Sequence, residues 1–163
     1  MMEADLIKVL HAGAGLVLLV LGVLALTARK SRTSRHIRVG DVYFWLLVFT
    51  LSSGMLIGLQ HWPRITVFQI VTPPTLLLGV LGYVMAKRRP RQWLRWHIVG
   101  QGGSYIGVVT AFGFQVFPNV LPSSPILTTA YWLVPTLVGS ILIGRTITKW
   151  VKRPPTARPP SVA

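Results

Sequence analysis

Residues Leu6–Thr27 read LIKVLHAGAGLVLLVLGVLALT, an apolar run whose only charged side chain is that of Lys8. At 1.5 Å per residue, a helix of this length crosses the hydrocarbon core of a bilayer, which is about 30 Å thick. Four further stretches of similar length and character follow. The sequence therefore predicts an all-α, polytopic membrane helix bundle with five transmembrane helices. The predicted spans are Leu6–Thr27, Gly40–Gln60, Ile65–Ala86, His97–Phe117 and Ile126–Ile147.

The composition supports a membrane protein. Hydrophobic residues make up 52% of the chain and charged residues only 12%, whereas a soluble domain carries about 25% charged residues. A net charge of +14 would suggest a nucleic-acid partner in a soluble protein. Here the charge lies at the ends of the predicted helices, so we expect anionic lipid head groups as its partners and no nucleic acid. The absence of cysteine excludes disulfides, thiolate metal sites and cysteine nucleophiles.

The basic residues predict the orientation. All but two of the 17 Lys and Arg residues lie in Arg29–Arg38, Lys87–Arg95 and Arg145–Arg158; the exceptions are Lys8 and Arg64. If all five spans cross, these three segments share one side of the membrane. Positive charge is retained on the cytoplasmic side. We therefore expect an N-terminus outside, a cytoplasmic C-terminus, and the inner (cytoplasmic) membrane of a bacterium as the location.

Five spans leave little room for a soluble domain. We expect residues 1–150 to form one transmembrane domain and residues 151–163, rich in proline and arginine, to form a disordered cytoplasmic tail. A cleaved signal peptide begins with positive charge. This chain begins with the acidic Glu3 and Asp5, so the first apolar stretch is predicted to remain as a helix.

Glycines and prolines shape the predicted spans. Gly54-x-x-x-Gly58 and Gly103-x-x-x-Gly107 each place two glycines on one helix face, which lets backbones approach closely in lipid. This pattern favours packing within the chain, with a homodimer as the alternative. The third span contains Pro73-Pro74 and the fifth Pro135, and each proline removes a backbone donor and interrupts its helix.

Four histidines are the main candidates for chemistry. The predicted topology places His11 and His61 toward the outside, and His36 and His97 toward the cytoplasm. His36, Gly40 and Tyr43 follow the i, i+4, i+7 spacing of one helix face, and His11 with Gly15 repeats its first step. The small residue leaves room beside the imidazole for the flat face of a cofactor or for another helix.

Several interpretations of the histidines stay open. Each one alone is typical of an amphipathic residue at a membrane interface. Two pairs at opposite membrane faces are more typical of function, because paired imidazoles on facing helices hold b-type haems. About 37 Å of straight helix separates His36 from His61, which is long for fast electron transfer between haems on those two residues. A metal ion is a further option, but the sequence lacks a local ligand spacing.

Two other polar residues lie near the predicted cytoplasmic face. Asp41 is the only acidic residue on that side. Arg145, just inside the end of the last span, has two predicted roles. It either pairs with Asp41 or, as we favour, extends to the interface.

The motif around the histidines resembles a known family. The run His11-Ala-Gly-Ala-Gly15, the basic loop, His36-x-x-x-Gly40-x-x-Tyr43 and the later Trp96-His97 are similar to a family of bacterial predicted integral membrane proteins of unknown function. The resemblance covers about residues 6–115. It implies a multi-span fold and no established activity, and it points to His11, His36, Gly40, Tyr43 and His97. Family members commonly have arginine after the second and third histidines, where Ile37 and Ile98 stand here.

No hydrolytic or nucleotide-dependent active site is evident, since a catalytic acid set, a P-loop and a dinucleotide fingerprint are all absent. Three classes remain. We favour a small electron-transfer protein that binds haem b or a quinone through its histidines. The alternatives are an accessory or assembly subunit of a larger membrane complex, and a small transporter or channel component. The predicted cofactor-binding residues are His11, His36, His61, His97, Gly40 and Tyr43.

Overall fold

The computed structural model describes residues 2–28, 35–60, 66–120 and 124–151. Its regular structure is helical, which confirms the predicted all-α class. Four helices contain their predicted spans and extend beyond them at one or both ends. The third helix extends past Ala86 to Arg88, and Ile65, the first residue of its predicted span, lies outside the described residues. The helices are α1 (Met2–Thr27), α2 (Arg35–Gln60), α3 (Thr66–Arg88), α4 (Trp93–Val120) and α5 (Pro125–Trp150). His61 and the tail beyond residue 151 lie outside the described residues.

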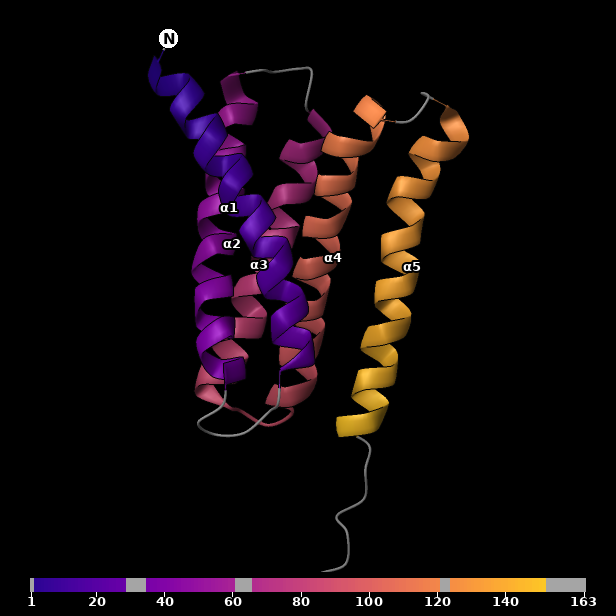
Figure 1. The fold of residues 1–163 in the computed structure, drawn as a ribbon. Helices are drawn as coiled ribbons and strands as arrows, with labels where there is room; N and C mark the ends of the chain where they lie inside the picture. The colour runs from indigo at the N-terminus through magenta and orange to yellow at the C-terminus, as the bar shows by residue number, and fades with distance from the viewer. Residues whose placement is uncertain (1, 29–34, 61–65, 121–123, 152–163) are drawn as a thin grey trace, which may run out of the picture.

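The first four helices form an up-and-down bundle (Figure 1). Contacts join α1 to α2, α2 to α3, α3 to α4, and α1 to α4, which closes the ring. Among the described residues, α2 and α4 lie on a diagonal without direct backbone contact. α5 lies outside this ring and packs against α4. The space between α2 and α4 is therefore spanned by side chains.

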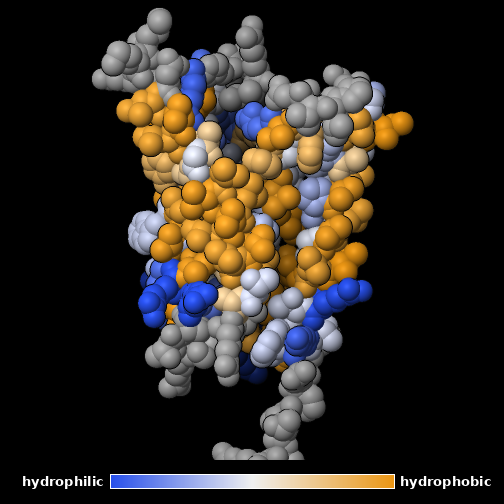
Figure 2. Space-filling view, viewed as in Figure 1, coloured by the Kyte–Doolittle hydropathy of each residue, from blue (hydrophilic) through white to orange (hydrophobic). Residues whose placement is uncertain are grey.

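Four of the helices, α1, α2, α3 and α5, are long and apolar enough to cross a membrane. Figure 2 shows the corresponding apolar band across the molecule. α4 is not among the four, although it has 28 residues, because glycines and polar residues such as Gln101 and Ser104 lower its hydropathy. These features indicate a multi-pass membrane protein with at least four candidate spans among the described residues.

Small residues bring α3 and α4 into close contact. A Cβ atom at Gly100 would lie 2.5 Å from the Leu78 carbonyl oxygen and 2.6 Å from the Gly82 Cα atom. One at Gly103 would lie 3.0 Å from Leu78 Cδ1. The predicted packing role of Gly103 is therefore confirmed. Gly107 faces Thr75 of α3, and the pair Gly54 and Gly58 faces His11 and Gln69.

A buried apolar layer lies at the centre of the bundle. Leu18 and Leu47 are fully buried, and Val108 and Tyr43 complete the cluster. The Tyr105 hydroxyl donates to the Leu19 carbonyl at 3.0 Å and so ties α4 to α1. This layer separates the polar groups at the two ends of the bundle from one another.

α3 continues as one helix through Pro73 and Pro74, and α5 continues through Pro135. α5 begins at a well-formed N-cap, in which the Ser124 hydroxyl accepts from the backbone N–H of Leu127. The structure describes every position of α5, and none of its residues is buried.

Candidate functional site

The end of the bundle where α2 and α4 begin, termed the basic end here, carries most of the described basic residues. Figure 2 shows strongly hydrophilic side chains at this end, in its lower part. The opposite end, where α1 begins, is termed the N-terminal end. Its one described basic residue is Lys8. The described basic residues at the basic end are Arg35, Arg38, Lys87, Arg88, Arg89, Arg91, Arg95, Arg145 and Lys149.

Two of the predicted site residues meet at the basic end. The rings of His36 on α2 and His97 on α4 have centroids 6.2 Å apart and an interplanar angle of 88°. Hydropathy does not determine the order of helices around a bundle, so the sequence did not predict whether these two histidines are neighbours. The structure joins the two histidines across the diagonal, from helices without direct backbone contact in the described chain.

Each of these imidazoles is held through its Nδ1 atom. His36 Nδ1 lies 2.9 Å from the Ala25 carbonyl oxygen, and His97 Nδ1 lies 2.9 Å from the Gly82 carbonyl oxygen. A carbonyl oxygen only accepts, so Nδ1 is assigned as the N–H donor in both rings. In the neutral ring the lone pair is then on Nε2. Histidines that ligate metals are commonly held in this way, with the second ring nitrogen bonded to a backbone carbonyl.

Local structure explains both anchors. Ala25 lies in the last turn of α1, where carbonyls lack donors from their own helix, and His36 supplies one from the second position of α2. Gly82 lies where α3 and α4 approach most closely, since a Cβ atom there would meet the Gln101 backbone nitrogen at 2.6 Å. The missing side chain makes room for Gln101, one turn after His97 on α4.

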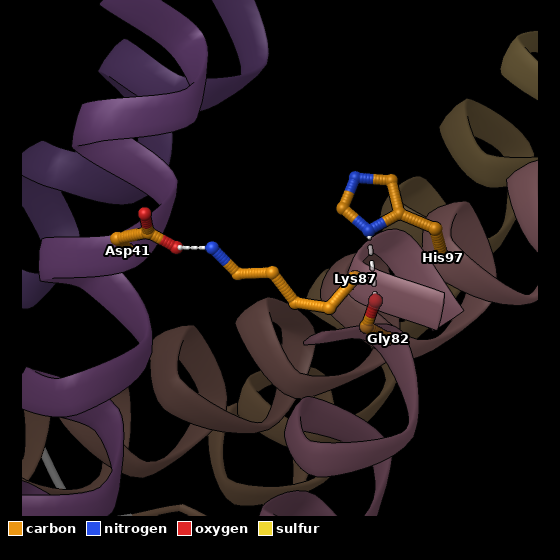
Figure 3. A network of polar contacts seen from close by, with 4 residues as sticks. All are labelled: Asp41, Gly82, Lys87 and His97. Carbon is orange, nitrogen blue, oxygen red and sulfur yellow. Dashed lines mark hydrogen bonds and ion pairs between the residues drawn. The ribbon is translucent and has the colours of Figure 1, made fainter. Parts of the chain in front are cut away.

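An ion pair lies beside the histidines. Lys87 Nζ on α3 is 2.7 Å from Asp41 Oδ1 on α2, and Figure 3 shows the pair spanning the space between the helices near the His97–Gly82 hydrogen bond. The predicted pairing of Asp41 with Arg145 is wrong, since Asp41 pairs with Lys87 instead. Arg145 is exposed, as expected for a side chain that extends to the interface.

Aromatic rings support this arrangement. The ammonium of Lys87 lies over the Tyr83 ring, 5.0 Å from its centroid. Tyr83 in turn stacks on Phe44 of α2, with centroids 3.8 Å apart and planes 6° apart. On the other side of the site, the Trp93 ring lies 6.3 Å from the His97 ring. The basic end of α2 is thus joined to α3 by an ion pair and a ring stack.

The two other residues of the His36 motif have different surroundings. A Cβ atom at Gly40 would meet nothing within 4 Å among the described residues. Tyr43, one turn deeper, is only 3% exposed, and its hydroxyl lies 3.4 Å from the Ser104 hydroxyl of α4. Tyr43 therefore belongs to the core, while Gly40 leaves open space on the helix face that carries His36.

His11 occupies a closed position toward the N-terminal end. Its Nδ1 atom lies 3.0 Å from the Ser53 hydroxyl oxygen. Ser53 donates its own proton to the Thr50 carbonyl, so Ser53 accepts from His11 Nδ1. The His11 ring lies against Gly54, and Thr50 lies against Gly15. The missing side chain of each glycine thus makes room for a larger side chain of the other helix.

The described residues show no group of three or more His, Asp or Glu side chains that could hold a metal ion. A tetrahedral site built from protein ligands alone is therefore not formed in the part of the chain that the structure describes. A cavity of about 270 Å³ lies between α4 and α5 and is lined by apolar side chains, among them Val109 and Val134. None of the predicted site residues lines it.

Sequence reasoning missed the backbone acceptors Ala25 and Gly82, Lys87, and the Phe44–Tyr83 stack. One signal was available for the ion pair. Asp41 is the only acidic residue after Asp5 in a chain with 17 basic residues, so a basic partner was to be expected. Which of the many basic residues provides it depends on helix order.

The comparisons with known proteins identify no relative. No protein-family model, curated protein or solved structure matches the chain. The resemblance to a family of membrane proteins therefore stays an expectation from the sequence.

Proposed function

We propose that this chain is a small membrane electron-transfer protein whose His36 and His97 would hold a b-type haem at its basic end. The observation that carries the proposal is the meeting of these two imidazoles, 6.2 Å apart, on opposite helices of the bundle. When bound, haem supplies one-electron redox chemistry, and its axial ligands tune the potential.

The separation of the rings supports this assignment. Two imidazoles on facing helices with centroids 6.2 Å apart would be placed to hold one haem between them. Haem brings four nitrogen ligands of its own and needs only two from the protein. Because the described residues form no group of three or more His, Asp or Glu side chains that could hold a metal ion, the histidine pair suits haem better than a bare metal ion.

The surroundings of the pair also support a cofactor. Helix bundles build their cofactor sites in the core, from side chains on facing helices. Among the described residues, α2 and α4 are separated across the diagonal, and a Cβ atom at Gly40, on the face that carries His36, would meet nothing within 4 Å. A flat ligand between His36 and His97 would use this space, with Tyr43 and Ser104 beneath it.

We place the basic end in the cytoplasm and the N-terminal end outside, because positive charge resists translocation. α4 would cross the membrane with the other helices, since it runs beside α3 and α5 over the height of the bundle (Figure 1). Its polar residues reduce its hydropathy, but His97, Gln101 and Ser104 bond to other helices or their own. The chain would then have five spans in the inner membrane of a bacterium.

A second candidate is an accessory subunit of a larger membrane complex. α5 favours this alternative because, within the described chain, it contacts α4 alone and buries none of its residues. Leu137 and Ile141 are 59% and 56% exposed. Co-purification of the tagged chain from membranes with a stoichiometric partner would support this role.

The test is an absorption spectrum of the detergent-purified protein, air-oxidised and then reduced with dithionite, after expression with haem supply. Low-spin bis-histidine haem gives a Soret band that sharpens on reduction and resolved α and β bands. His36→Ala or His97→Ala should abolish this spectrum. His11→Ala is the matched control and should retain it. A featureless spectrum of the unmodified protein at full haem supply would contradict the proposal.

A further inference from the structure

The ion pair between Lys87 and Asp41 involves one of the few acidic residues of this chain. Asp41 is the only acidic residue after Asp5, among 17 basic residues. Its carboxylate meets the ammonium of Lys87 at 2.7 Å. The basic end therefore has many cations and, within the described chain, a single carboxylate, which lies directly after Gly40 on α2.

The pair is open enough to exchange partners. The side chains of Lys87 and Asp41 are 48% and 40% exposed. Ion pairs with this exposure contribute little to stability. A carboxylate from a ligand can therefore replace that of Asp41 on the ammonium at little cost to the fold.

The ammonium is held in place independently of Asp41. Lys87 Nζ lies over the Tyr83 ring, whose negative face attracts a cation. Tyr83 is itself fixed by its stack on Phe44. The Tyr83 ring therefore gives the ammonium a second contact, which does not depend on Asp41.

The position suits the edge of a ligand centred on the histidines. Lys87 follows Gly82, the residue that anchors His97, by five positions on α3, about 7–8 Å along the helix axis toward the basic end. Figure 3 shows the Lys87 side chain extending from α3 toward Asp41, with the His97 ring near the base of that side chain, where it bonds to the Gly82 carbonyl. A flat ligand between the histidines would present its outer edge to Lys87.

From these observations we infer that Lys87 binds a free carboxylate on the edge of the ligand, and that Asp41 competes for the same ammonium. The ligand class is thus a metal tetrapyrrole with acidic side chains. This inference rests on the proposed function and adds a specificity residue to it. No other side chain at the basic end combines a fixed position beside the histidines with an exchangeable acidic partner in the described chain.

The experiment compares haem with haem dimethyl ester, which has the same ring and iron but no free carboxylate. Both are titrated by absorbance into the detergent-solubilised apoprotein and its variants Lys87→Gln, Asp41→Asn and Lys149→Gln. Lys149 is the matched control, since its ammonium also lies near a ring, 5.6 Å from the centroid of Trp150, but on α5.

We expect Lys87→Gln to weaken haem binding about tenfold, as for loss of one charge-assisted hydrogen bond, and to leave binding of the ester unchanged. Asp41→Asn should tighten haem binding a few-fold, because the competitor is removed, again without effect on the ester. Lys87→Arg should restore most of the affinity for haem. Lys149→Gln should change neither ligand.

Two results would overturn the inference while leaving the proposed function intact. One is equal weakening of haem and ester by both variants, which would mean that the pair only joins α2 to α3. The other is no effect of Lys87→Gln on either ligand. If the unmodified protein binds neither ligand, the proposed function itself fails, and the inference fails with it.

Discussion

The two ends of the bundle use the same short pattern, histidine followed by glycine four residues later, in different ways. His11 and His36 both bond through Nδ1 to the neighbouring helix of the α1–α2 pair. At the N-terminal end, Thr50 packs against Gly15. At the basic end, a Cβ atom at Gly40 would meet nothing within 4 Å of the described residues. The pattern therefore produces packing at one end and open space at the other.

His36 and His11 also differ in the residues that they contact. His36 meets His97 from the opposite side of the bundle, whereas His11 bonds to a serine. The buried layer of Leu18, Leu47 and Val108 lies between the two ends. A change at one end should therefore leave the other largely unaffected, since residues without shared contacts contribute additively.

The largest expected effect is a loss of stability at the close contact between α3 and α4. In Gly100→Ala, the new methyl group would meet the backbone of Leu78 and Gly82 at 2.5–2.6 Å, where neither helix can yield without moving. We expect a loss of about 3 kcal/mol or more in the free energy of unfolding, measured by helicity during titration with a denaturing detergent. Gly13→Ala is the matched control, since its Cβ would meet nothing within 4 Å among the described residues. It should preserve or raise stability.

The second prediction separates the two histidines. His11→Ala should cost about 1–3 kcal/mol in unfolding free energy, because Ser53 loses its buried donor and a gap opens against Gly54. Its effect on the haem spectrum should be small. His36→Ala should remove the spectrum and cost less stability, since Ala25 lies at a helix end with access to water. Equal losses of stability and spectrum in both variants would contradict the distinction.

The third prediction concerns replacement of Gly40 and Gly15 by a larger residue. Gly40→Leu should leave the unfolding free energy within about 0.5 kcal/mol but weaken haem binding, because the side chain enters the open space beside His36. Gly15→Leu should do the reverse, destabilising the α1–α2 contact by about 1–3 kcal/mol while haem binding persists. Absorbance titration and unfolding curves measured on the same samples give both quantities. If fully folded Gly15→Leu bound haem weakly, the proposed difference between the two glycines would be wrong.

The smallest expected effect lies in the loop at the basic end. Gln92 has φ of 63°, a left-handed conformation that costs a residue with a side chain about 1 kcal/mol relative to glycine. Gln92→Gly should therefore raise the melting temperature slightly without changing the haem spectrum. Arg91→Gly, at a position without positive φ, is the control and should not stabilise. A lower melting temperature for Gln92→Gly would show that its side chain has a further role.

Much of the fold could be predicted from composition along the chain. Five apolar stretches of membrane-spanning length predicted five helices, and all five are present. The ends were predicted less well, since Arg35 and His36 belong to α2 and Trp93 belongs to α4. Hydropathy marks the apolar part of a helix, while hydrogen bonding continues the helix into charged residues.

The candidate site could be predicted only in part. The spacing of His36, Gly40 and Tyr43 placed them on one helix face, but it did not distinguish the buried Tyr43 from the open Gly40. It also gave no sign that His97 bonds to Gly82 or that Asp41 selects Lys87. These contacts join residues of different helices, α3 with α4 and α2 with α3, so they depend on how the helices are placed around the bundle.

The sequence by itself determined the helices and the end of the bundle that carries positive charge, because both depend on local composition and on the cost of placing charge in lipid. Only the tertiary structure decided which histidines meet and which glycines stay open. The physical reason is that each side chain's surroundings depend on the order, rotation and depth of neighbouring helices. In this chain those are set by close contacts such as Gly82 with Gly100 and His11 with Gly54.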